Sequence, residues 1–384
     1  MNIILFDDPV LRTNLLPLTF TRPVSEIRVG ILTITEKWER YFQTKASFAT
    51  QNYLSKKFTK KTSPDNLFIN GAVCPDDKLF DAIKNLNVGE SLIKNSQLIA
   101  LRSSETELGK VKTEIEYTND ITLIDYPWKI FQNNGNQIRA DYKLITVNRK
   151  SASIKDPHTR TYNESNIFLE EGVILHSAIL NAENGPIYLG KNSQVQEGSI
   201  IRGPFSLGEG AIVNMGGKMR ADTTIGPFCK IGGEVSNAVL FANSNKAHDG
   251  FLGNSVLGEW CNLGADTNTS NLKNNYDHVK VWSYSKNDLV NIRMPNCGLI
   301  MGDHSKAGIN TMFNTGTVVG VSSNIFGTGF PPKFIPSFQW GGASGFEVYQ
   351  YEKAMETAAR VLARRNISLS EIDKEILKKV FDYK

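Results

Sequence analysis

The chain has few cysteines, little net charge and no long hydrophobic run. Only four of its 384 residues are cysteines and none forms a CxxC pair, which argues against a disulfide framework or a zinc site and favours a reducing cytoplasm. The formal net charge of +4 is too small to indicate nucleic acid or a membrane surface as a partner. No stretch of about 18 apolar residues occurs, so we expect no transmembrane helix. The start, MNIILFDD, lacks the regions of a signal peptide.

What the chain does contain is a six-residue repeat. A helix would repeat every 3.6 residues and an ordinary strand every 2, so a period of six indicates a short strand followed by a tight turn. Three such units close one triangular coil, and coils bury their apolar sides only against one another. The apolar positions are Leu189, Val195, Ile201, Leu207, Val213, Met219, Ile225 and Ile231, then Leu257 and Leu263, then Met301, Ala307, Phe313, Val319 and Ile325.

Glycine often follows these apolar positions, as at Gly190, Gly208 and Gly226, and Asn214 takes a similar place. Both residue types tolerate a left-handed φ, so we expect them to relax the corners of the coil. The pattern predicts an all-β domain that is a left-handed parallel β-helix.

The repeat also divides the chain. Residues 1–150 alternate short strands with helical patterns, which predicts a Rossmann-like α/β domain. We predict a linker at 151–166, the β-helix at 167–344 and C-terminal helices at 345–384, the last opened by a capping box of Ser368 and Glu371. Two stretches, 237–256 and 270–298, lose the register, and we expect such loops to carry function.

Two stretches resemble a known family. SNKAHDGFLGNSVLGEWCNLGADT is similar to the region around the catalytic histidine of the bifunctional GlmU family, and NLLPLTFTRPV is similar to part of that family's sugar nucleotidyltransferase domain. The resemblance implies a nucleotidyltransferase-like first domain and an acyltransferase β-helix. It also implies acetyl-CoA as acyl donor, a sugar phosphate or sugar nucleotide as substrate, and a homotrimer, with neither nucleic acid nor a membrane as partner.

The resemblance assigns His248 as the general base, a role that suits an imidazole because it titrates near neutral pH. The alternative is a histidine that serves only its loop. Phe251 stands where the family has a tyrosine, so a hydroxyl is lost. The family's Asn-Tyr motif matches either Asn271 by spacing or Asn275 and Tyr276 by identity. The remaining candidate substrate contacts are Lys246, Asn262, Ala265 and Lys280, the last either a phosphate contact or a solvated loop lysine.

The first domain departs from the family at its nucleotide loop. DDPVLRTN contains no glycine, so backbone N–H groups approach phosphates less readily. Arg12 and Arg22 are candidate phosphate contacts, or they brace the domain. Asn70 stands near the family's metal-binding aspartate, and a neutral amide is a poor magnesium ligand. We expect Mg²⁺ only if this domain is active.

Three functions follow from these features. The first is an acyl-CoA-dependent transferase acting on a sugar, with a nucleotidyltransferase-like domain of doubtful activity. The second is a sugar-1-phosphate nucleotidyltransferase. The third is a non-catalytic scaffold or sensor that binds a sugar nucleotide.

Overall fold

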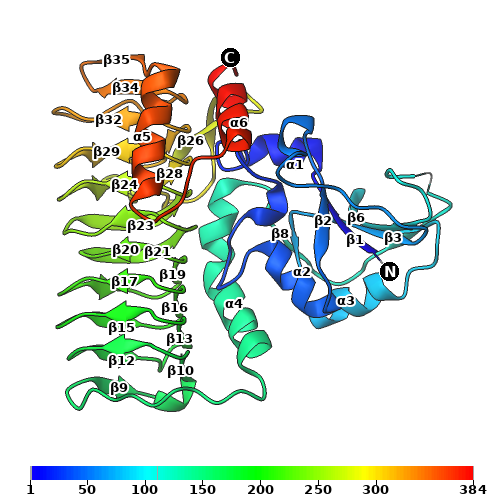
Figure 1. Ribbon diagram of the computed structural model, residues 1–384, viewed down its shortest axis with the longest axis horizontal. Helices are drawn as coiled ribbons and strands as arrows, with labels where there is room; N and C mark the ends of the chain where they lie inside the picture. The colour runs from blue at the N-terminus through cyan, green and yellow to red at the C-terminus, as the bar shows by residue number, and fades with distance from the viewer. Residues whose placement is uncertain (1, 110, 384) are drawn as a thin grey trace.

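The computed structural model describes residues 2–109 and 111–383, and in it a long β-solenoid lies beside an α/β region (Figure 1). The predicted combination of α/β domain, parallel β-helix and C-terminal helices is confirmed. Helix α4 (Pro127–Thr146), which belongs to the α/β region, runs along the side of the solenoid that faces this region (Figure 1). None of the helices in these residues is both long and apolar enough to span a membrane.

The α/β region is built on a six-stranded sheet in the order β2-β1-β3-β6-β5-β7. Strand β1 is parallel to both of its neighbours, β2 and β3, as in a Rossmann-like fold, whereas β6 runs antiparallel to β3. The strands are β1 (Asn2–Phe6), β2 (Ala46–Ala49), β3 (Asn66–Asn70), β5 (Glu90–Lys94), β6 (Gln97–Ser103) and β7 (Thr113–Glu116), with β4 (Val73–Cys74) paired to β8 (Thr122–Leu123). The helices are α1 (Pro9–Asn14), α2 (Ile34–Phe42), α3 (Asp77–Lys84) and α4.

The solenoid has about 10 turns and three faces of parallel strands. The first face contains β10 (Ile167–Leu169), β13 (Ile187–Leu189), β16 (Phe205–Leu207), β19 (Thr223–Ile225), β28 (Leu299–Met301), β31 (Thr317–Val319) and β33 (Phe334–Ile335). The second contains β11 (Ile174–Leu175), β14 (Gln194–Val195), β17 (Ile212–Val213), β20 (Lys230–Ile231), β22 (Asn245–Lys246), β24 (Asn262–Leu263), β29 (Lys306–Ala307), β32 (Asn324–Ile325) and β34 (Gln339–Gly342). The third contains β9 (Arg160–Tyr162), β12 (Ile179–Asn181), β15 (Ile200–Arg202), β18 (Lys218–Met219), β25 (Asn268–Thr269) and β30 (Met312–Phe313), while β21 (Glu234–Leu240) and β23 (Phe251–Leu257) span the first and third faces.

The strand register confirms the six-residue count. Leu189 pairs with Leu207, and Leu207 pairs with Ile225, each eighteen positions later. The predicted apolar positions are all buried and share one core. Each coil therefore stacks its apolar residues on those of its neighbours.

The glycines that follow the apolar positions have a different role from the one predicted. Gly190, Gly208 and Gly226 are not left-handed; the positive φ falls later in the turn, as at Asn192, Gly210 and Phe228. A Cβ at Gly226 would lie 1.7 Å from the carbonyl oxygen of Phe241 in the next coil. Glycine is required here because successive coils approach too closely for a side chain.

The two interruptions of the repeat differ from each other. The first, 237–256, does not leave the solenoid: it forms most of β21, all of β22 and most of β23. Its register is lost because Ile225 pairs with Leu240, only fifteen positions later, so this coil is short. The second, 270–298, does leave the solenoid and forms a hairpin of β26 (Lys280–Ser283) and β27 (Asp288–Asn291).

One hydrophobic core joins the two parts of the molecule. Val239, Val256 and Ile300 point outward from the first face and belong to the same buried cluster as Ile3 and Trp38 of the α/β region. Val279, Val281 and Ile292 of the β26–β27 hairpin join this cluster. The α/β region is therefore packed onto the solenoid.

Some predicted boundaries need correction. Strand β9 pairs with β12, so solenoid pairing begins inside the segment predicted as a linker. The segment 345–350 is not helical: β35 (Gly345–Val348) forms an antiparallel hairpin with β34, and α5 (Tyr351–Ala363) follows. Helix α6 (Glu371–Phe381) is capped by Ser370, whose hydroxyl accepts from the Asp373 N–H, and not by Ser368.

We expect Gly226→Ala to destabilise the protein by about 1–3 kcal/mol, because the new methyl group overlaps the backbone of the next coil. Gly308→Ala is the matched control, since its Cβ would come no closer than 3.3 Å to a neighbouring atom. Urea unfolding measures both. Equal shifts in the two variants would contradict the close-approach explanation.

Candidate functional site

His248 lies in the bend between β22 and β23, at the corner where the second face of the solenoid meets the third. Its side chain is exposed and lines two cavities of about 730 Å³ and about 690 Å³. The imidazole is therefore open to ligands from both sides.

The larger cavity is strongly basic. The second face contributes Lys230 and Lys306, and the end of α5 contributes Arg364 and Arg365, whereas no aspartate or glutamate lines it. Burial lowers the pKa of Lys306 to about 8. Arg365 donates through Nη2 to the carbonyl oxygen of Phe228 at 2.6 Å and so ties the end of α5 to the solenoid. A cavity with this charge attracts anions.

Two of the predicted substrate contacts lie beside His248. Asn262 and Ala265 line the larger cavity, and Ala265 also lines the smaller one. Phe251 lines neither; its backbone N–H donates to Asn268 Oδ1 at the start of β23.

Lys246 was predicted to contact substrate, but its side chain is 1% exposed and points into the solenoid. Its ammonium group donates to the backbone carbonyl oxygens of Gly232, His248 and Asp249. All three N–H donors are thus used inside the protein, so Lys246 does not present a free ammonium group to a substrate.

The other predicted contacts belong to the 270–298 insertion. Asn271 donates to Asn254 Oδ1 at 2.7 Å, while Asn275, Tyr276 and Lys280 are exposed. None of the four lines a cavity beside His248. Within one chain these residues therefore do not lie beside the histidine, whichever alignment of the Asn-Tyr motif is used.

Sequence reasoning missed the basic residues of the larger cavity. Lys230 and Lys306 alternate with inward apolar residues, so their outward direction could be read from the repeat. Arg364 and Arg365 directly follow helix α5, and only the fold brings them to the second face.

In the α/β region, the glycine-free loop folds into the short helix α1. Asp8 caps this helix by accepting from the N–H groups of Val10 and Leu11. Asp7 is buried, which raises its pKa, and it pairs with Arg12 at 3.2 Å. Arg12 also donates to the carbonyl oxygens of Thr19 and Arg22. This predicted phosphate contact is thus occupied by the domain itself.

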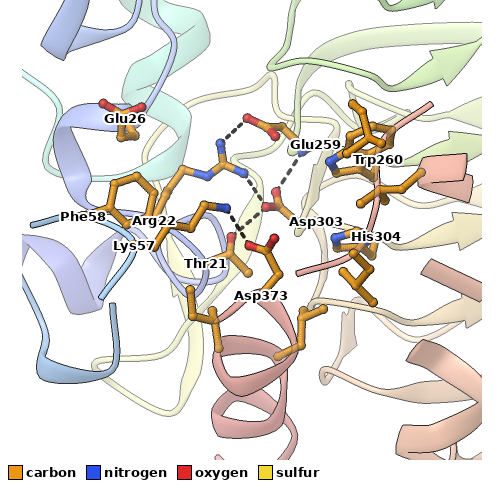
Figure 2. A pocket seen from close by; sticks show the side chains of 15 residues that line it. Thr21, Arg22, Glu26, Lys57, Phe58, Glu259, Trp260, Asp303, His304 and Asp373 are labelled. Carbon is orange, nitrogen blue, oxygen red and sulfur yellow. Dashed lines mark hydrogen bonds and ion pairs between the residues drawn. The ribbon is translucent and has the colours of Figure 1, made fainter. Parts of the chain in front are cut away.

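Arg22 joins the α/β region to the solenoid. Figure 2 shows its guanidinium between Glu259, at 2.8 Å, and Asp303. Burial lowers the pKa of Arg22, but the two carboxylates outweigh this effect and raise it above its usual value. These groups border a cavity of about 330 Å³ that also includes Lys57, paired with Asp373 of α6 (Figure 2). Burial lowers the pKa of His304, in the same cavity, to about 3.

The residues considered for magnesium do not fit a metal site. Asn70 donates to the Leu98 carbonyl oxygen and accepts from the Ala72 N–H. Asp141 of α4, a buried carboxylate of this region, pairs with Lys37 and accepts from two backbone N–H groups. Among residues 2–109 and 111–383, no group of three or more His, Cys, Asp or Glu side chains is placed to hold a metal.

Comparisons with known proteins found similar sequences for the α/β region alone and for most of the chain. Residues 3–150 match the family model for sugar nucleotidyl transferase. Bifunctional protein GlmU of Methanocaldococcus jannaschii is 38% identical over 87 residues, which cover 23% of this chain and 21% of that protein. The resemblance to the GlmU family is confirmed. A bifunctional sugar-1-phosphate nucleotidylyltransferase/acetyltransferase of Sulfurisphaera tokodaii is 24% identical over 283 residues, covering 72% of this chain and 62% of that protein.

The chain spans only about a fifth of the length of the first GlmU relatives that it matches. Among solved structures, the polySia-specific acetyltransferase NeuO has 14% sequence identity and a TM-score of 0.28, with 50% of this chain and 85% of that chain covered. A structural similarity this low carries no information on function.

We expect Arg22→Met to destabilise the protein by about 3–5 kcal/mol, because Asp303 would stay buried without its partner. Arg220→Met is the control: its ion pair with Glu234 is exposed and contributes about 0–1 kcal/mol. Chemical denaturation measures both. A loss no larger than that of Arg220→Met would show that Arg22 does not fix the junction.

Proposed function

We propose that this protein is an acyltransferase that moves an acyl group from a coenzyme A thioester to a sugar, with His248 as the general base. The observation that carries the proposal is the cavity beside His248, which four basic side chains and no acidic one line. Coenzyme A carries phosphate groups, and sugar phosphates and sugar nucleotides are anions as well. Lysine and arginine are the side chains that bind such groups.

In the proposed reaction, His248 accepts a proton from an amine or hydroxyl of the sugar as that group attacks the thioester carbonyl carbon. The new C–N or C–O bond gives a tetrahedral oxyanion, which backbone N–H groups stabilise. The C–S bond then breaks, the thiolate takes the proton from His248, which restores the base, and the acylated sugar and free coenzyme A leave. Asn262, which lines the same cavity, is placed to orient a ligand beside the imidazole.

A homotrimer is part of the proposal. Met215 and Ile309 flank the two cavities and are 71% and 69% exposed. Apolar side chains this exposed beside a polar site suit coverage by another surface. A second copy of the chain would supply that cover, and sedimentation would show how many copies associate. A cytoplasmic location is part of the same proposal.

Nucleotidyl transfer is a second candidate function, favoured by the family match of residues 3–150. Asp7 pairs with Arg12, and Arg22 pairs with acidic residues of the solenoid. Because these charges are already paired inside the protein, they favour acyl transfer over nucleotidyl transfer. Incubation with nucleoside triphosphates, magnesium and several sugar-1-phosphates tests the second, and release of pyrophosphate would establish it. Sugar-nucleotide binding without turnover in either assay would favour a sensor.

We expect His248→Asn to lower the rate of acyl transfer by about 10²–10⁴-fold, because general base catalysis contributes this much. Release of free thiol from acetyl-CoA, with a panel of amino-sugar phosphates as acceptors, measures the rate. His278→Asn is the control, since His278 is an exposed histidine of the 270–298 insertion. Equal rates for His248→Asn and the unaltered protein would exclude His248 as the base.

We expect Arg364→Met to raise the KM for acetyl-CoA about 10-fold and to leave kcat nearly unchanged, since a lost charged contact to phosphate weakens binding. Arg360→Met, on α5 but paired with Glu356 in solvent, should change neither constant. An unchanged KM in Arg364→Met would place the phosphates elsewhere.

A further inference from the structure

Lys246 occupies a position in the solenoid that its neighbours fill with aliphatic side chains. It pairs in register with Ile231 of the preceding coil, and Asn245 beside it pairs with Asn262, which aligns Lys246 with Leu263 of the following coil. Ile231 and Leu263 are both buried in the solenoid core. A lysine in this column is costly because its charge leaves water, so its presence calls for a compensating role.

The contacts of the ammonium group indicate what that role is. Its Nζ donates to the His248 carbonyl oxygen at 2.7 Å, to that of Asp249 at 3.1 Å and to that of Gly232 at 3.3 Å. The first two belong to the bend that carries the imidazole, and the third belongs to the corner of the preceding coil. Lys246 therefore fastens the bend to the solenoid from inside.

The anchored bend directs its carbonyl oxygens and the His248 side chain to different sides. The carbonyl oxygens of His248 and Asp249 are directed toward the buried ammonium group, while the His248 side chain is exposed and lines both cavities. Burial lowers the pKa of Lys246 to about 8, while the charges of Asp249 and Asp266 act to raise it. The lysine is thus held by three backbone carbonyl oxygens of the solenoid.

We propose that Lys246 is a positioning residue, which holds the His248 bend from inside the solenoid so that the imidazole faces the acyl-transfer site. This inference rests on the proposed function for its effect on rate. It does not depend on that function for its effect on the histidine, because the anchoring is a property of the chain alone.

The test compares Lys246→Met, which keeps the length of the side chain and removes its donors, with Val213→Ala. Val213 lies in the same inward column two coils earlier, with Ile231 between it and Lys246. We expect Lys246→Met to lower kcat by about 10²-fold with little change in KM, since a small displacement of a catalytic group costs about this factor. Val213→Ala should keep kcat within about 2-fold, and thermal unfolding of both variants shows whether they fold.

The second readout is independent of activity. The NMR signals of the His248 imidazole, assigned with His248→Asn, should shift and broaden in Lys246→Met and stay unchanged in Val213→Ala. Unchanged imidazole signals in Lys246→Met would overturn the proposal, and so would an equal loss of kcat in both variants. A raised KM with unchanged kcat would also overturn it, by making Lys246 a substrate contact. If the unaltered protein transfers no acyl group, the proposed function fails, and the NMR comparison alone decides the positioning role.

Discussion

Four successive coils of the solenoid's first face are apolar on both sides, and this constraint determines how the molecule is assembled. In four successive coils an inward apolar residue follows an outward one that is also apolar: Val239–Leu240, Val256–Leu257, Ile300–Met301 and Val318–Val319. A parallel sheet that is apolar on both sides must be covered on both. Helix α4, the β26–β27 hairpin and the core of the α/β region provide that cover. The α/β region is therefore held by burial of apolar surface, and Arg22 adds an ion pair at its border.

Within the α/β region, the two arginines predicted as phosphate contacts bond to groups of the protein itself. The arginine of the NLLPLTFTRPV stretch pairs with Glu259 and Asp303 of the solenoid. Directly after β1, Asp7 pairs with Arg12 and Asp8 caps helix α1. These charged groups therefore serve as structural contacts of the domain.

The sequence predicted the repeat well because each inward position obeys one rule: an apolar side chain must meet those of the coils before and after it. It predicted the corner glycines for the wrong reason, since the approach of the next coil depends on backbone spacing that composition does not reveal. The covered face was predictable in principle. On the second face a polar residue precedes the inward one, as at Lys230–Ile231 and Asn324–Ile325. On the first face the residue before the inward Leu240 is the apolar Val239. The position of Arg364 beside His248 could not be predicted from the sequence, because it depends on how α5 packs on the second face.

The two interruptions of the repeat have different structural effects, because one adds residues to a coil and the other removes them. The second adds residues between β25 and β28, and added residues can leave the solenoid to cover the first face. The first removes residues: β21 passes the corner without a turn, so the coil is short and remains inside the stack. Within this shortened coil, Lys246 takes the inward position that Ile231 fills in the coil before. The buried interior and the exposed bend of the candidate site are joined here, since the Lys246 ammonium group donates to the carbonyl oxygen of His248.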